Sequence, residues 1–164
     1  TVTISVEATT IGCGSLIKPT KVDIPEDTNA AVLVCELLEK YGFTYEYSGT
    51  KEKNFYLARI SKNENFLTPA VPKDLEAHLL QEDKNYPGSY YLDSLGEFDF
   101  ATGSGWMYSV NGIYPNYGFS DCYLQDGDVL RVRFTLRYGA DIGGAMASGN
   151  GGNEGDSGNW EKEW

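Results

Sequence analysis

Few side chains in this 164-residue sequence combine the types and the spacing that catalysis needs. The single histidine, His78, lies between Leu75 and Leu79 in a pattern typical of an ordinary amphipathic helix. No Gly-x-Ser-x-Gly sequence accompanies it. Glu97 and Asp99 could act as an acid–base pair in glycoside hydrolysis, but acids two positions apart on a strand are more often solvated. We therefore expect that the chain is not an enzyme.

Candidate metal ligands are also sparse. Asp126 and Asp128 could contribute to a calcium site, but they supply too few ligands, and Asp-Gly-Asp is a common turn. Cys13, Cys35 and Cys122 lack the CxxC spacing of zinc sites. Cys35 falls on an apolar helical face, where a buried thiol is expected, which leaves Cys13 and Cys122 as candidates for a disulfide. We expect no metal and no required cofactor.

Charge and hydropathy exclude two classes of partner. The chain has 24 acidic and 13 basic residues, a formal charge of -11, which repels nucleic acids and anionic bilayers. No run of about 20 apolar residues could span a membrane. The chain begins without a start methionine or a signal peptide, so we treat it as a fragment or a mature segment. The expected partners are a small molecule, another surface protein or glycan, and other domains of the same parent chain.

Alternating apolar and polar residues predict several strands. These fall at about residues 3–8, 21–24, 43–47, 55–60 and 129–137, with strand-like sequence also at Tyr90-Tyr91-Leu92 and Leu95. In the last strand, Leu130, Val132, Phe134 and Leu136 form an apolar face. Arg131, Arg133 and Arg137 form the opposite face. They could bind an anionic ligand, but pairing with the sheet's own carboxylates is the expected role.

One helix is clear. Thr28 is placed to cap it, and Gly42 is placed to end it. Between them the apolar residues recur at spacings of three and four: Ala31, Val34, Leu37, Leu38 and Tyr41. Residues 61–88 contain three prolines around a short helical pattern at 74–81, and we interpret them as an insertion.

The composition changes after Tyr138. Residues 139–164 are rich in Gly, Ser, Asn and acid, which is typical of a flexible tail or linker. Trp160 and Trp164 could anchor this tail to the domain or to a neighbouring molecule. We therefore expect one domain over residues 1–144 and a Gly-rich tail over 145–164.

An aromatic hairpin follows the insertion. Trp106, Tyr108 and Val110 share one face of a strand, and Asn111-Gly112 favours a type I′ turn that lets Ile113-Tyr114 pair back. The side chains of Trp106, Tyr108, Tyr114 and Tyr117 could form an exposed platform that stacks on sugars, corrinoid rings or partner side chains. Alternatively, Trp106 and Tyr108 belong to the core. We take these four residues as the candidate ligand-binding set.

The hairpin and its neighbours carry a family resemblance. Ser104-Gly105-Trp106-Met107-Tyr108-Ser109-Val110-Asn111-Gly112, Tyr114-Pro115-Asn116, Leu124 with Asp126-Gly127-Asp128, and Asp141-Ile142-Gly143 resemble the transcobalamin C-terminal-like family of bacterial surface domains. The similarity runs from about residue 3 to 144. It is strongest at 91–143 and weak at 61–88.

The resemblance implies an α+β fold. In it, a β-grasp-like mixed sheet wraps around one main helix, and this chain adds the short helical insertion and the Gly-rich tail. It also implies an extracellular or cell-surface setting, usually within a longer surface or secreted protein of Gram-positive bacteria. In the cobalamin carriers the domain covers one side of the corrinoid, and a helical barrel, which this chain lacks, covers the other.

We therefore expect a non-catalytic extracellular binding module that recognises a cobalamin-like or other small ligand through the aromatic hairpin. The alternative is a structural spacer or adhesion domain in a larger surface protein.

Overall fold

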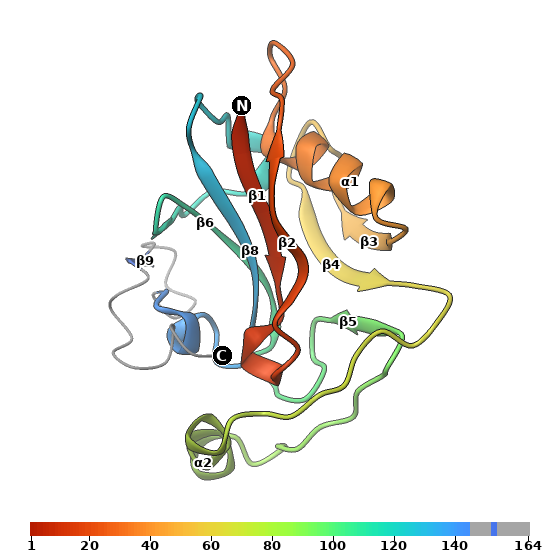
Figure 1. Cartoon of the computed structure of the whole chain (residues 1–164). Coiled ribbons are helices and arrows are strands. Elements are labelled where there is room, and N and C mark those ends of the chain that lie inside the picture. Colours follow the sequence, from red (N-terminus) through yellow and green to blue (C-terminus); the bar gives the residue numbers. More distant parts are fainter. Residues whose placement is uncertain (145–151, 154–164) are drawn as a thin grey trace.

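The first strand and the last long strand lie side by side and parallel in the middle of the larger sheet (Figure 1). The computed structural model describes residues 1–144 and 152–153. Thr3 of the first strand lies opposite Val129 of the last. The sheet is mixed and has the order β2-β1-β8-β6-β7-β9. Its strands are β1 (Val2–Glu7), β2 (Ser15–Val22), β6 (Gly105–Val110), β7 (Ile113–Tyr114), β8 (Val129–Thr135) and β9 (Gly152–Asn153).

A smaller antiparallel sheet lies beside the larger one. It contains β3 (Thr44–Ser48), β4 (Tyr56–Ser61) and β5 (Ser94–Gly96), in that order. Tyr45 of β3 lies opposite Ile60 of β4. The helix α1 (Ala30–Lys40) lies next to β3 (Figure 1). Helix and mixed sheet together confirm the α+β class, and the topology agrees with a β-grasp-like arrangement.

The helix α1 forms where its periodicity predicts, but its N-cap is one residue later than expected. Asn29 has an extended backbone, and its side-chain oxygen accepts a hydrogen bond from the amide of Val32 at 3.1 Å. Its amide nitrogen also donates to the carbonyl of Lys51 at 2.9 Å. The prediction of Thr28 as the cap is wrong, because Asn29 caps the helix and the Thr28 hydroxyl donates instead to the carbonyl of Glu26 at 3.4 Å. The side-chain amide of Asn29 makes both of these hydrogen bonds. The hydroxyl of Thr28 lies one residue before the N-cap position and does not form the capping bond.

The two neighbouring residues give a direct test of this cap. We expect Asn29→Ala to lower the free energy of unfolding by about 1–2 kcal/mol, because it removes the capping acceptor and the hydrogen bond to the carbonyl of Lys51. Thr28→Ala should change stability by less than about 0.5 kcal/mol. Urea unfolding of both variants measures the difference. Equal losses in the two variants would contradict the assignment.

The segment between β4 and β5 contains the second helix. The helix α2 (Lys73–Glu82) confirms the pattern seen at residues 74–81, and its Leu75 and Leu79 are buried. The amide of Ala70 bonds to the carbonyl of Ile11 at 2.7 Å, so the segment is fixed to the body of the protein. Three short 3-10 helices complete the described chain at Thr9–Ile11, Phe119–Asp121 and Ala140–Ile142. No helix among the described residues is long and apolar enough to cross a membrane.

The predicted apolar face of β8 forms the centre of the core. Leu130, Val132, Phe134 and Leu136 are all buried, and they pack with Ile4 and Val6 of β1 and with the inner face of α1. Burial of Cys35 on that helical face is confirmed. Burying side chains of this size contributes about 1.5–3 kcal/mol each before the loss of conformational entropy is counted.

The opposite face of the larger sheet is also covered, which the alternating pattern did not predict. Arg133 is only 1% exposed, and its Nη1 donates to the carbonyl of Ile142 at 3.3 Å. That carbonyl belongs to the segment 139–144, which folds back over the sheet. Arg131 pairs with a carboxylate of the sheet as expected, because it bonds Glu7 of β1 at 2.8 Å. Arg137 bonds Glu82 at 2.5 Å, and this carboxylate belongs to α2 and not to the sheet.

Two other expectations are wrong. Tyr90–Leu92 do not form a strand, because only the carbonyl of Leu92 bonds a neighbouring segment and no ladder develops. All three cysteines are free thiols: Cys13 follows the first 3-10 helix, and Cys122 is buried beside Tyr108. Burial raises the pKa of both thiols. The predicted tail over 145–164, with Trp160 and Trp164, lies outside the described residues except for 152–153.

Candidate ligand-binding site

The aromatic hairpin has the predicted backbone. β6 and β7 are joined by Asn111 and Gly112, whose φ angles of 51° and 84° are those of a type I′ turn. The side chains, however, do not form an exposed platform. Trp106, Tyr108 and Tyr114 are buried, and Tyr117 alone of the four is exposed, at 49%. The platform expectation is wrong for three residues because both faces of the sheet are covered.

Trp106 is fixed between the two sheets. Its indole Nε1 donates to the carbonyl of Leu95 in β5 at 3.0 Å. Its ring meets Phe134 of β8 edge to face, with 5.2 Å between the centroids. The hydrogen bond at the indole nitrogen and the packing against Phe134 together fix the orientation of the ring.

Tyr108 is fixed in a similar way. Its hydroxyl donates to the carbonyl of Tyr117 at 2.6 Å, and its ring stacks on Phe119 with centroids 4.3 Å apart. Burial, together with its polar neighbours Cys122 and Asp121, raises the pKa of Tyr108, so the phenol stays neutral at physiological pH. The loop that carries Tyr117 is thereby held against β6.

A small hollow of about 150 Å³ lies beside these two rings. It is bounded by the start of β4, by β6 and by the loop before the 3-10 helix at Phe119–Asp121. β4 and β6 belong to different sheets and lie next to each other here. The lining residues are Phe55, Tyr56, Leu57, Trp106, Met107, Tyr108, Pro115, Gly118 and Phe119. Such a lining is apolar and aromatic, and it contains no acidic or basic side chain.

The rest of the predicted set lies outside the hollow. The ring of Tyr117 does not line it, although its carbonyl holds Tyr108. Tyr114 lies on the other face of the sheet, where its hydroxyl donates to the carbonyl of Ile142 at 2.7 Å and accepts from Arg133 at 3.2 Å. The hollow therefore brings together two of the four predicted residues, Trp106 and Tyr108.

The β4 wall was missed from the sequence. The ring of Phe55 meets Phe119 edge to face at 5.8 Å, and its amide donates to the hydroxyl of Ser120 at 3.2 Å. Burial and a hydrogen bond with Glu97 raise the pKa of Tyr56, whose side chain is otherwise partly exposed. The alternation at 55–60 predicted a strand, but no sequence signal placed that strand against β6.

The carboxylates considered for chemistry have structural partners. Asp99 binds both Nη atoms of Arg59 at 2.9 Å and accepts from the amide of Gly96 at 2.9 Å. Asp126 binds the N-terminal amine at 2.7 Å, which lowers the pKa of its carboxyl. Asp128 accepts from the amide of Gln125 at 2.8 Å, as expected of a turn residue.

No cluster of three or more metal-ligating side chains occurs in residues 1–144 and 152–153. His78 lies on the exposed side of α2.

Comparison with known proteins gives one match. Residues 71–136 match a family described as a domain of unknown function, DUF4430. No curated protein and no solved structure matches the chain. The matched segment begins just before α2, inside the part that we interpreted as an insertion, and ends just after β8.

The DUF4430 match includes one side of the hollow and not the other. β6 and the loop at 115–119 fall inside it, so Trp106, Tyr108 and Phe119 belong to the matched segment. Phe55, Tyr56 and Leu57 lie before it. The hollow is thus built where the DUF4430-like segment meets the preceding strand β4.

Proposed function

We propose that this chain is a non-catalytic binding module that anchors one ring-sized apolar group of a small ligand in the hollow between β4 and β6. The main support for this proposal is that Trp106 and Tyr108, whose rings are held by hydrogen bonds, line this concave site. Rigid rings lose little conformational freedom on binding, and an uncharged apolar lining favours an apolar or aromatic group. A volume of about 150 Å³ suits an anchor group, not a whole drug-sized ligand.

The resemblance to transcobalamin C-terminal-like domains supports a corrinoid as the first ligand to test. One edge group of a cobalamin-like molecule would enter the hollow. The remainder would lie over the loop at 115–119, where the ring of Tyr117 is exposed. The extracellular, surface-protein setting rests on the same resemblance.

The alternative function is a structural spacer or adhesion domain. The burial of Trp106, Tyr108 and Tyr114 favours it, because these rings then serve the packing of the sheet. The two functions differ in whether any small molecule binds at β4 and β6.

A substitution at Tyr56 distinguishes the binding function from the spacer function. Its side chain lines the hollow and is 43% exposed, so Tyr56→Ala removes a wall without opening the core. We expect wild type to bind cobalamin, cobinamide or a member of a glycan panel, and Tyr56→Ala to weaken that binding about tenfold. Absorbance titration measures the corrinoids, and calorimetry measures the rest.

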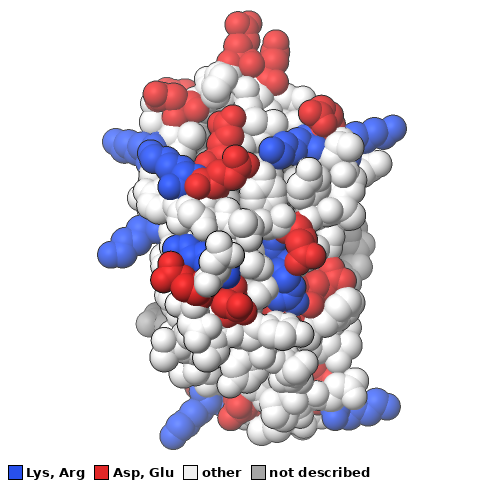
Figure 2. Space-filling view, turned by 90° about the vertical axis from the view of Figure 1, so that its right-hand side faces the viewer, with Lys and Arg blue, Asp and Glu red and all other residues white. Residues whose placement is uncertain are grey.

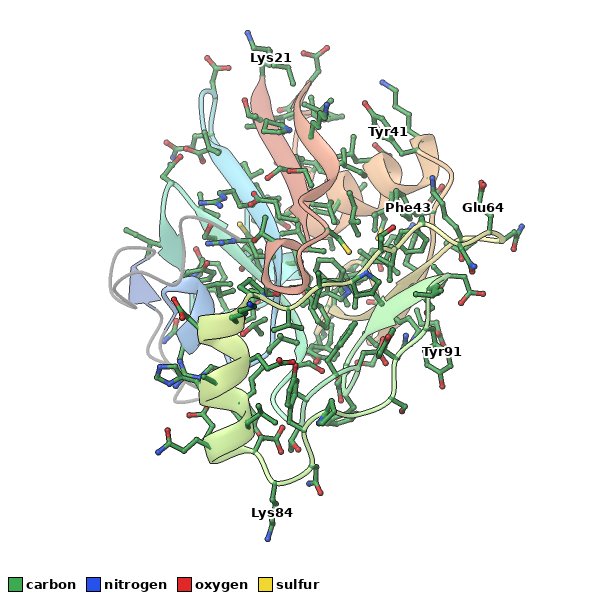
Figure 3. All side chains as sticks on the ribbon, turned by 60° about the horizontal axis from the view of Figure 1, so that its bottom comes forward. Lys21, Tyr41, Phe43, Glu64, Lys84 and Tyr91 are labelled. Carbon is green, nitrogen blue, oxygen red and sulfur yellow. The ribbon has the colours of Figure 1, made fainter. Side chains whose placement is uncertain are left out.

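Tyr41→Ala is the matched control. Tyr41 is also 43% exposed but lies at the end of α1 (Figure 3) and does not line the hollow. It should bind as wild type does, and Tyr117→Ala should show a smaller loss than Tyr56→Ala. Absence of binding across the whole panel would favour the spacer.

A further inference from the structure

A second hollow, of about 350 Å³, lies beyond the end of the larger sheet where β8 ends and β6 begins. One side is formed by the end of α2 and the residues after it, at the bottom of Figure 1. A volume of this size falls within the range of small-molecule sites, about 300–1,000 Å³. It is separate from the aromatic hollow, with which it shares no lining residue.

One wall of this second hollow is a tyrosine ring held in an uncommon backbone conformation. Tyr138 has a φ of 54°, a left-handed value that costs a non-glycine residue about 1–2 kcal/mol. Its amide donates to the carbonyl of Gly103 at 2.9 Å. A Cβ on Gly103 would lie 2.7 Å from the ring, so only glycine permits this contact. The ring is still 44% exposed, and strained residues of this kind are typical of ligand sites.

The floor and rim combine apolar and polar groups. Leu79 and Leu136 are buried and form the apolar floor. On the rim, the carboxylate of Asp83 accepts from the amide and the hydroxyl of Thr102 at 2.8 and 3.0 Å, and from the amide of Asn85 at 3.0 Å. These bonds join the end of α2 to the loop before β6. The side-chain amide of Asn85 donates a long hydrogen bond, 3.5 Å, to the hydroxyl of Thr102, and a ligand could replace this weak bond.

Most charged residues of the lining are held by partners within the protein. Glu82 is paired with Arg137 at 2.5 and 3.2 Å, and the hydrogen bonds from Thr102 and Asn85 hold the pKa of Asp83 low although burial opposes them. Lys84 points away from the body of the protein (Figure 3). Lys84 therefore adds little charge inside the hollow. Glu82 and Arg137 neutralise each other, and the carboxylate of Asp83 is held by hydrogen bonds, so the hollow does not favour an anionic ligand.

From this lining, we infer that the second hollow binds a neutral sugar unit. The C–H face of a sugar packs on an aromatic ring and an apolar floor, and its hydroxyls form hydrogen bonds with polar side chains at the rim. Tyr138 supplies the ring, and Asn85 and Thr102 supply polar groups. This site goes beyond the proposed binding at β4 and β6 and does not depend on it.

Amide chemical shifts test the inference directly. Two-dimensional ¹H–¹⁵N spectra are recorded with the methyl glycosides of glucose, galactose, mannose and N-acetylglucosamine, each up to about 20 mM, because single sugars commonly bind weakly. We expect at least one glycoside to shift the amides of Asn85, Thr102, Gly103 and Tyr138. Tyr138→Gly keeps the left-handed backbone without strain and should weaken that binding about tenfold.

Two further variants complete the experiment. Asn85→Ala should also weaken binding, and Tyr123→Ala, at an exposed tyrosine outside the hollow, should leave it unchanged. The inference is overturned if no glycoside shifts these amides. It is equally overturned if acetate or phosphate shifts them and the sugars do not, or if the sugars shift only residues 106–108 and 115–119.

Discussion

Glu7→Gln is expected to lower the free energy of unfolding by about 3 kcal/mol at neutral pH, because it removes the charge that balances the guanidinium groups of Arg131 and Arg133. The carboxylate of Glu7 accepts from Nε and Nη2 of Arg131, both at 2.8 Å, and lies 3.8 Å from Nε of Arg133. Ser5 donates a further bond to it at 2.7 Å. A neutral amide of the same shape leaves the buried Arg133 with less compensation.

The loss in Glu7→Gln should depend on pH. Burial alone would raise the pKa of Glu7, but the bonds from Arg131 and Ser5 and the charges of both arginines outweigh it and hold the pKa below its usual 4.5. The folded protein therefore favours the ionised form. Its stabilising effect is complete above the unfolded value and is lost as pH falls through the folded one.

Urea unfolding of wild type and Glu7→Gln at several pH values measures this effect. The gap in stability should be widest near neutral pH and should close as the pH falls below about 4. Glu64→Gln is the control, because Glu64 is exposed on the loop after β4 (Figure 3). It should match wild type at every pH. A gap that stays constant down to about pH 3 would contradict this account of Glu7.

The second large effect is expected at Trp106. Trp106→Ala should lower the free energy of unfolding by about 3–5 kcal/mol, since it leaves a cavity between the sheets and removes the hydrogen bond from the indole to the carbonyl of Leu95. Trp106→Phe should lose less, because a ring still packs on Phe134. Thermal and urea unfolding measure both variants.

Tyr123→Ala is the control for Trp106. Tyr123 is an exposed aromatic residue, so its loss should change stability by less than about 0.5 kcal/mol. If Trp106→Ala proved as mild as Tyr123→Ala, Trp106 would not be the fixed core ring described above. The aromatic hollow would then lack one of the fixed rings that line it.

The sequence predicted the helix α1 and the β6–β7 turn because interactions between residues close in the sequence determine both of them. The spacing of Val34, Leu37 and Leu38 gave α1, and Asn111-Gly112 gave the turn between β6 and β7. The cap of α1 shows the limit of such signals. Thr28 and Asn29 are both good capping residues by type, and the second bond from Asn29 to Lys51 comes from tertiary structure.

The aromatic hollow was predicted only in part, because the wall formed by residues 55–57 comes from another sheet and is brought there by tertiary structure. Trp106 and Tyr108 were chosen from a local aromatic pattern, but their burial depends on elements that cover both faces of the sheet. Alternation in β8 predicted a basic face paired with carboxylates, but it did not predict that the segment 139–144 covers Arg133. Neither this covering segment nor the approach of β4 to β6 leaves a periodic pattern in the sequence.

The charged side chains are not gathered into a single patch on the face shown in Figure 2. Acidic and basic side chains are interspersed on the face shown in Figure 2, although the chain carries a formal charge of -11. A ligand at the aromatic hollow would therefore be selected mainly by apolar contact, because the lining there contains no charged side chain. This favours a test with ligands that carry an apolar ring.

The central claim is that the hollow between β4 and β6 holds the ligand. The most direct measurement is a ¹H–¹⁵N chemical-shift titration of the whole chain with cobinamide and cobalamin up to about 1 mM. The expected result is a saturable shift of the amides at 55–57, 106–108 and 116–119, reduced in Tyr56→Ala and unchanged in Tyr41→Ala. Spectra that stay unchanged with both corrinoids, or that shift only at residues remote from this hollow, would contradict the account.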